Sequence, residues 1–209
     1  MLSFQTLASF FGVCVLLALT PGPDNLFVLM QSAQRGWRVG LCVVAGLCLG
    51  LVVHTTAVAL GLAAVFAASA VAFTALKWVG AAYLAWLAWQ ALRAPAGAGP
   101  AQGQAGTAAP WRMVGRGMVM NLTNPKVLVF CLAFLPQFTD PARGSVAAQV
   151  LVLGGVFIVS TLLVFGGIAC FSGAFGALLL RSARAQRWLN RAAGLVFLGL
   201  ALRLATAQR

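Results

Sequence analysis

The sequence predicts an all-α membrane protein with six transmembrane helices, arranged as two inverted three-helix repeats whose first and fourth helices are broken. Three observations predict this fold class. Of the 209 residues, 62% are apolar and 8% are charged, with a mean hydropathy of +0.97, whereas soluble domains carry about 25% charged residues. Uncharged runs long enough to cross a bilayer, which takes about 17 to 25 residues, recur along the chain. Proline-rich breaks interrupt two of these runs.

The predicted spans, in chain order, are residues 4–30, 40–66, 70–92, 114–137, 146–171 and 189–206. The first is not a signal peptide, because a signal peptide has a basic n-region and no Lys or Arg precedes Arg35. Residues 94–110 are rich in Ala, Gly, Pro and Gln and carry no bulky apolar side chain, which predicts a flexible tether. We therefore expect a first repeat over 1–93, a cytoplasmic linker over 94–111 and a second repeat over 112–209.

Basic residues alternate between the predicted loops. Nine of the fourteen Lys and Arg residues follow the first, third or fifth span: Arg35, Arg38, Arg93, Arg112, Arg116, Arg181, Arg184, Arg187 and Arg191. By the positive-inside rule these loops face the cytoplasm, so both termini are expected outside it. Because the net charge of +12 sits in short loops between apolar spans, we expect a lipid bilayer around the protein and no nucleic-acid partner.

The two halves show a weak internal repeat. Gly22-Pro23-Asp24 in the first span aligns with Asn124-Pro125-Lys126 in the fourth, at an offset of 102 residues. Three spans per half bring the second half into the membrane from the opposite side, so the repeat is inverted. Inverted repeats are characteristic of secondary transporters, in which broken helices at corresponding positions form the substrate site.

The prolines free backbone carbonyls at both breaks. Pro21 and Pro23 cannot donate to the carbonyls of Leu17 and Leu19, and Pro125 cannot donate to that of Asn121. Unsatisfied backbone costs several kcal/mol in lipid and survives at depth only against protein or a watery cavity. Each break also restarts a helix, with Pro23 and Pro125 as first residues and Asn124 as the N-cap.

The breaks carry opposite charges. Asp24 is one of only two acidic residues in the chain, and a carboxylate in mid-bilayer costs about 2.5 to 3.5 kcal/mol. Lys126 and the start of its helix could hold a carboxylate, while Asp24 could hold an ammonium, which together would suit an α-amino acid. Three alternatives stay open: the two side chains neutralise each other without substrate, they form a permanent structural pair, or Asp24 takes up a proton.

Further polar residues are weighed as neighbours of this site. Gly22, Thr20 and Asn25 adjoin the first break, and Asn121 and Thr123 precede the second. His54 shares a helical face with Gly46 and Gly50 and is either a proton relay or a packing residue on a face of small residues. Lys77 and Arg191 are expected to reach a membrane interface, and Tyr83 either lines the cavity or lies in an interfacial belt.

At these residues the chain resembles the LysE/RhtB family of bacterial amino-acid exporters, including homoserine- and threonine-efflux-like members. The motifs that carry the resemblance are Thr20-Pro21-Gly22-Pro23, Lys77-Trp78-Val79-Gly80-Ala81-Ala82-Tyr83-Leu84, Asn121-Leu122-Thr123-Asn124-Pro125-Lys126, Phe134-Leu135-Pro136-Gln137-Phe138 and Asn190-Arg191-Ala192-Ala193-Gly194. The resemblance implies a six-span protein of the bacterial inner membrane that exports amino acids or close derivatives against proton entry.

Other functions fit the sequence less well. It contains no Walker A loop, H-E-x-x-H or G-x-S-x-G motif, which argues against an enzyme. The five cysteines form no C-x-x-C pair, so we expect no metal and no cofactor. A dibasic amino acid would bring two cations to a single acid, which favours neutral substrates. An exporter of another small ion or metabolite and a non-transporting scaffold remain the alternatives, and the glycine-rich faces would permit a homo-oligomer.

Overall fold

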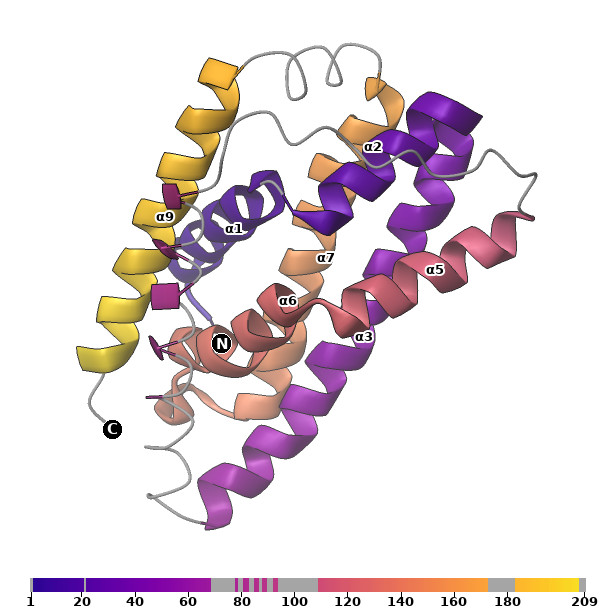
Figure 1. The fold of residues 1–209 in the computed structure, drawn as a ribbon. Helices are drawn as coiled ribbons and strands as arrows, with labels where there is room; N and C mark the ends of the chain where they lie inside the picture. The colour runs from indigo at the N-terminus through magenta and orange to yellow at the C-terminus, as the bar shows by residue number, and fades with distance from the viewer. Residues whose placement is uncertain are drawn as a thin grey trace.

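The computed structural model describes residues 2–20, 22–68, 109–172 and 183–206, together with scattered residues between 78 and 93. These residues are mostly helical and contain no strand (Figure 1), which confirms the predicted all-α class. The third predicted span, at residues 70–92, lies largely outside the described residues, as does the linker.

The first predicted span is a broken helix. Helix α1 (Phe4–Leu19) and helix α2 (Pro23–Arg35) meet at an angle of 65°. Pro23 is the first residue of α2, as predicted, because a proline at that position loses no helical hydrogen bond. The helix runs past the predicted end at residue 30 and stops at Gly36, whose φ of 89° favours glycine.

The fourth predicted span is broken in the same way. Helix α5 (Pro110–Thr123) is followed by α6 (Pro125–Val129), a π-helical turn η1 (Phe130–Phe134) and a 3₁₀ turn η2 (Leu135–Phe138). The part from Pro110 to Thr123 and the part from Pro125 to Phe138 meet at 56°. Pro125 begins α6, and its cap is Asn124, whose Oδ1 accepts a hydrogen bond from the Lys126 amide at 3.0 Å. Both predicted breaks are therefore confirmed.

The remaining helices are longer and unbroken. They are α3 (Trp37–Ala68), α7 (Val146–Cys170) and α9 (Ala183–Thr206), with a short 3₁₀ turn η3 (Pro141–Arg143) before α7. Among the described residues, α3 and α7 are long and apolar enough to cross a membrane, and each bent pair adds one candidate. Helix α9 contains the sixth predicted span but starts earlier, at Ala183. The count of six and the inverted arrangement remain predictions.

Helix α3 packs closely on α5 and α7 because glycines line the contacts. A Cβ atom added to Gly46 would collide with the carbonyl oxygen of Val114, and one added to Gly117 would collide with that of Val43. On α7, a Cβ atom at Gly154 would collide with the side chain of Thr55. Small residues let helix backbones approach in a membrane, so the predicted small-residue face of α3 is confirmed.

The interior of the helical bundle contains two separate apolar clusters. The aromatic cluster contains Phe10, Phe130, Phe134, Phe138 and Phe157 with residues such as Cys14, Leu17, Leu51 and Val127. The second cluster contains Ala18, Leu47, Phe165 and the neighbouring residues Val28, Leu29, Val43, Val44, Met113, Ile168 and Ala169. Successive residues of α1, Leu17 and Ala18, belong to different clusters, so the boundary between them lies at the first helix break.

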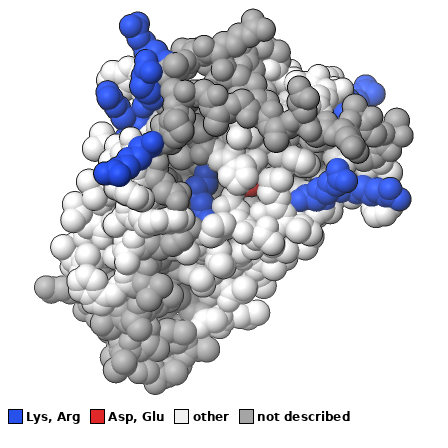
Figure 2. All heavy atoms as spheres, viewed as in Figure 1, with Lys and Arg blue, Asp and Glu red and all other residues white. Residues whose placement is uncertain are grey.

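Basic side chains gather at one end of the molecule. On the face drawn in Figure 2, Lys and Arg atoms form one group at the upper left, where Figure 1 shows the start of α9, and another at the right, where it shows the starts of α3 and α5. The centre of the same face shows one small acidic patch and one small basic patch. Trp37 and Trp111 stand beside this basic end, with Arg38 and Arg112 5.4 and 5.3 Å from their ring centres. Tryptophan and arginine together are typical of a membrane interface.

Candidate functional site

The two helix breaks meet at Asn124. Its amide Nδ2 donates a hydrogen bond to Asp24 Oδ2 at 2.7 Å, and both side chains are buried. Its Oδ1 is the oxygen that caps α6. The cap follows from the sequence, whereas the bond to Asp24 joins residues 100 positions apart and could not be read from it. Asn124 thus connects the start of α2 to the start of α6.

Lys126 binds the end of α1. Its ammonium donates to the carbonyl oxygens of Leu17 and Thr20 at 3.2 and 3.3 Å. Asn25 donates from its amide Nδ2 to the carbonyl of Ala18 at 2.7 Å. Because the end of a helix carries partial negative charge, the ammonium is stabilised there. Three carbonyls at the first break, those of Leu17, Ala18 and Thr20, therefore accept from side chains, one of which comes from the second half of the chain.

The second break has a partner in α3. The carbonyl of Asn121, which Pro125 leaves without its helical donor, accepts from the Asn124 amide at 3.1 Å and lies 3.3 Å from His54 Nε2. A Cβ atom added to Gly50 would lie 2.6 Å from Asn121 Oδ1. Gly50 and His54, which the sequence places on one helical face, thus both contact Asn121.

Asp24 and Lys126 do not form an ion pair. Both residues are described, and no carboxylate oxygen of Asp24 lies within 4.0 Å of the Lys126 nitrogen. The permanent ion pair that the sequence left open is therefore not formed in direct contact, although both side chains line the same cavity and their opposite charges attract each other across it. Each charge has its own polar partners instead.

The two charged side chains line one small cavity, which we call the central cavity. Its volume is about 20 Å³, and a single water needs roughly 10 to 15 Å³, so the cavity has room for about one water molecule. It lies at the boundary between the two apolar clusters. Its lining residues are Leu17, Ala18, Asp24, Leu47, Leu51, Asn121, Lys126, Val127, Phe157, Thr161 and Phe165.

Buried oxygen atoms around the breaks lack hydrogen-bond partners. They are Asp24 Oδ1, Asn25 Oδ1 and Asn121 Oδ1. Buried polar atoms are nearly always paired in folded proteins, so each exception requires an explanation. An ammonium has three donors, of which Lys126 uses two on the carbonyls of α1. Unpartnered acceptors and an ammonium with remaining donor capacity are thus gathered at one place.

The sequence did not predict which residues of α3 and α7 line the central cavity. Leu47 and Leu51 come from α3, and Phe157, Thr161 and Phe165 come from α7. Both helices are apolar on every side, so no contrast of polarity marks the inward face. Thr161, which follows Ser160 in a long apolar run, is the polar side chain that could have indicated this wall.

Other predicted site residues shape the breaks without lining the central cavity. Gly22 is the N-cap of α2, and a Cβ atom there would lie 3.4 Å from Lys126 Nζ. The Thr20 hydroxyl donates to the carbonyl of Leu16 at 2.8 Å, and only its own carbonyl reaches Lys126. Thr123 is exposed and bonds to its own helix. Arg191 is exposed. Pro21, Lys77 and Tyr83 lie outside the described residues.

A family model describes most of this chain. The model of the LysE type translocator matches residues 15–208, which include both helix breaks. The chain belongs to the LysE family. This LysE-type chain is 36% identical to a homoserine/homoserine lactone efflux protein of Salmonella typhi over 207 residues, 99% of each chain. It is 31% identical to a leucine efflux protein of Enterobacter sp., covering 91% of this chain and 90% of the relative.

A further relative of this LysE-type chain is an uncharacterized membrane protein of Vibrio cholerae, 36% identical with 93% of each chain covered. No solved structure matches it. Family membership and the named efflux relatives identify the protein as a membrane transporter. In the described residues no group of three His, Cys, Asp or Glu side chains could hold a metal ion.

Proposed function

We propose that this LysE-family protein exports neutral amino acids, as zwitterions, across the bacterial inner membrane. The single observation that carries the proposal is the central cavity, where Asp24 and Lys126 face the same space without pairing. The relatives named for homoserine and leucine efflux support the substrate class. An α-amino acid carries the two charges that would complement these side chains.

Each end of the substrate has a group to receive it. The α-ammonium would donate to Asp24 Oδ1, which is buried and has no partner. The carboxylate would accept from the Lys126 ammonium, which has donor capacity left beside its two bonds to the carbonyls of α1. Leu47, Leu51 and Phe157 supply an apolar wall for a neutral side chain. A second cation on the substrate would find no second acid in this lining.

The structure corresponds to a conformation in which the central cavity is too small for an amino acid. The central cavity accommodates about one water, so an amino acid enters only when the helices around the breaks move apart. Apolar clusters on both sides of the cavity fit a transporter that opens one side at a time around a fixed site. Asp24 would exchange its proton for the ammonium, which makes the export an amino-acid/proton antiport.

The proposed orientation follows from the basic end of the molecule. Arg38, Arg112, Arg116, Arg184 and Arg187 are exposed, and the helix starts that carry them lie toward one end (Figure 1). Positive loops stay in the cytoplasm. This end therefore faces the cytoplasm, and the chain termini face outward.

Export is tested by efflux from cells loaded with labelled leucine, homoserine, homoserine lactone or lysine. Losing a hydrogen bond to a charged group costs about 1.5 to 3 kcal/mol, so Asp24→Asn should slow efflux of every transported amino acid at least about tenfold. Homoserine lactone has an ammonium and no carboxylate, so Lys126→Met should impair homoserine efflux more than lactone efflux. Collapsing the proton gradient should slow wild-type efflux.

The matched control is Thr123→Ala, beside the second break but exposed and bonded to its own helix. It should export at the wild-type rate. Wild-type efflux by Asp24→Asn at normal membrane levels would refute the site, and the absence of efflux for the whole panel would refute the substrate class.

A further inference from the structure

A second and larger cavity lies at the start of α1. Its volume is about 340 Å³, within the range of roughly 300 to 1,000 Å³ that holds small molecules. We call it the polar cavity, because most of its lining residues are polar: Leu2, Ser3, Gln5, Thr6, Ser9, Gln137, Phe138, Thr139, Asp140 and Arg143. The proposed function gives this cavity no role.

An ion pair and hydrogen bonds hold the wall of the polar cavity in place. Asp140 and Arg143 form an ion pair with a distance of 3.1 Å between Oδ2 and Nε. Gln149, a buried residue of α7, accepts from the Asp140 amide at 2.9 Å and donates to its carbonyl at 2.8 Å. The hydroxyls of Ser3 and Thr6 lie 2.8 Å apart. Groups of both charge signs, about half exposed, are therefore held in place beside hydroxyls.

Two rows of side chains connect the polar cavity to the central cavity. On α1 the row is Ser3, Thr6, Phe10, Cys14 and Leu17, spaced three or four residues apart as on one helical face. It begins at the polar cavity and ends at Leu17 in the central cavity. Its ends, Ser3 and Leu17, are 14 positions apart, which corresponds to about 20 Å at 1.5 Å per residue.

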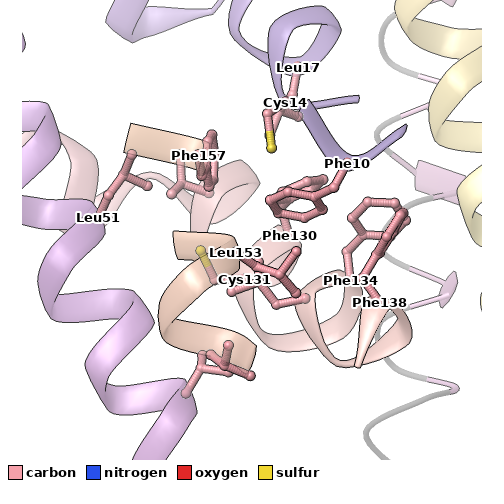
Figure 3. Packing of buried hydrophobic residues seen from close by; sticks show 14 of the residues in the cluster. Phe10, Cys14, Leu17, Leu51, Phe130, Cys131, Phe134, Phe138, Leu153 and Phe157 are labelled. Atoms are coloured by element: carbon pink, nitrogen blue, oxygen red, sulfur yellow. The ribbon is translucent and has the colours of Figure 1, made fainter. Parts of the chain in front are cut away.

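The second row comes from the other half of the chain. It consists of Val127, Phe130, Phe134 and Phe138, where Val127 lines the central cavity and Phe138 lines the polar cavity. Within the aromatic cluster, Phe10 of the first row lies against Phe130, Phe134 and Phe138 of the second (Figure 3). Both halves thus contribute to one connection between the cavities.

Phenylalanine rings close this connection. Phe10 lies 5.1 Å from Phe138 and 6.1 Å from Phe130, measured between ring centres, and Phe130 lies 5.2 Å from Phe157. Phe134 lies 4.8 Å from both Phe130 and Phe138. All five rings are buried. A zwitterion cannot pass such a barrier without losing the water around both charges, so the rings must separate for anything to cross.

The backbone that carries three of the rings is irregular. Phe130–Phe134 is π-helical and Leu135–Phe138 is 3₁₀. Single π-helical turns are rare and occur frequently at functional sites. The row on α1 lies on a regular helix, so the irregular row is the better candidate for the side that moves.

We propose that the polar cavity is the release site for the transported amino acid, and that Phe10, Phe130, Phe134, Phe138 and Phe157 form the barrier that separates it from the central cavity. The proposal rests on the proposed function, because it takes the same zwitterion as ligand. The start of α1 lies outside the cytoplasm in the proposed orientation, so the cavity is on the exit side. The carboxylate and guanidinium of Asp140 and Arg143 match the two charges of the ligand.

The release site is tested by filling it. Ser9→Trp adds a bulky side chain at an exposed position that lines the polar cavity, and it should lower leucine or homoserine efflux at least fivefold while leaving their binding to the purified protein unchanged. Ala8→Trp is the matched control, since Ala8 is equally exposed and does not line the cavity. Equal efflux by the two variants would overturn the release site.

The barrier is tested with a native thiol. Cys131 is fully buried within the aromatic cluster. A small polar methanethiosulfonate, added to the purified protein and followed by peptide mass spectrometry, should modify Cys131 at least fivefold faster with leucine or homoserine present. Ser9→Trp should suppress this increase, and Ala8→Trp should not. Efflux is measured for the same protein: efflux without Cys131 modification overturns the barrier, whereas absence of efflux refutes the proposed function.

Discussion

The central feature at the scale of single residues is the division of polar partners between Asp24 and Lys126. One oxygen of Asp24 accepts from Asn124, and the other is unpartnered. Lys126 uses two donors on the carbonyls of Leu17 and Thr20. Because the two charges are not in direct contact, a substrate can bind both without first breaking an ion pair. It competes only with weaker bonds to neutral groups.

His54 beside the second break has two candidate roles, which mutation can distinguish. Its Nε2 lies 3.3 Å from the carbonyl of Asn121, so His54 either supplies a donor to that carbonyl or relays protons. We expect the donor role to dominate. His54→Gln keeps a donor without a titrating ring and should retain at least about half of the efflux, with an unchanged pH profile. His54→Leu leaves the carbonyl with the Asn124 amide alone and should lower efflux about fivefold, in line with roughly 1 kcal/mol for a hydrogen bond.

The measurement is initial efflux rate against external pH for the three proteins, at matched membrane levels. A relay would give the opposite pattern: His54→Gln would fail as badly as His54→Leu, and its pH profile would flatten.

The sequence predicted the roles of residues that depend on their chain neighbours, and it did not predict contacts between residues far apart in the chain. The roles of Pro23, Asn124 and Pro125 at helix starts follow from local backbone chemistry, and the structure confirms them. The contacts of Lys126 with α1 and of Asn124 with Asp24 depend on how two halves are placed in space. Nothing local encodes that placement.

At the scale of elements, the close packing of α5 on α3 fixes the position of the second break in the bundle. Gly46 and Gly117 allow the backbones to touch, while Gly50 makes room for Asn121. The glycine spacing on α3 predicted this close packing. The π-helical turn at Phe130–Phe134 could not be predicted in the same way, because its residues are uniformly apolar and an α-helix would use them equally well.

The crossing gives a prediction for stability. A Cβ atom at Gly46 would collide with the Val114 carbonyl and lie 2.7 Å from the Met118 amide nitrogen, and these backbone atoms cannot move aside as side chains can. Overpacking costs about 1 to 3 kcal/mol, so Gly46→Ala should lower the midpoint of thermal unfolding in detergent by several degrees. Gly61→Ala is the control on the same helix, since a Cβ atom there meets nothing within 4 Å. Equal unfolding midpoints for the two variants would contradict the close crossing.

At the scale of the whole molecule, the described residues form a sequence of compartments along the bundle: the polar cavity, the phenylalanine barrier, the central cavity and the second apolar cluster toward the basic end. The sequence predicted the charged centre and the basic end. It did not predict the polar cavity, because residues 137–143 meet the start of α1 only in three dimensions. The inverted repeat remains a prediction, supported by two breaks with similar bends of 65° and 56°.

The division of the chain into two repeats gives the last prediction. The contacts between the halves, such as Asp24 with Asn124 and Gly46 with Gly117, are non-covalent, so the linker over 94–111 should act only as a tether. Residues 1–93 and 112–209, co-expressed as separate chains, should restore a substantial share of efflux, and neither half should do so alone. A split inside α3, after Leu51, should restore none because it divides a helix that both halves pack on. Failure of the first pair, with both pieces present in the membrane, would show that the linker contributes more than connection.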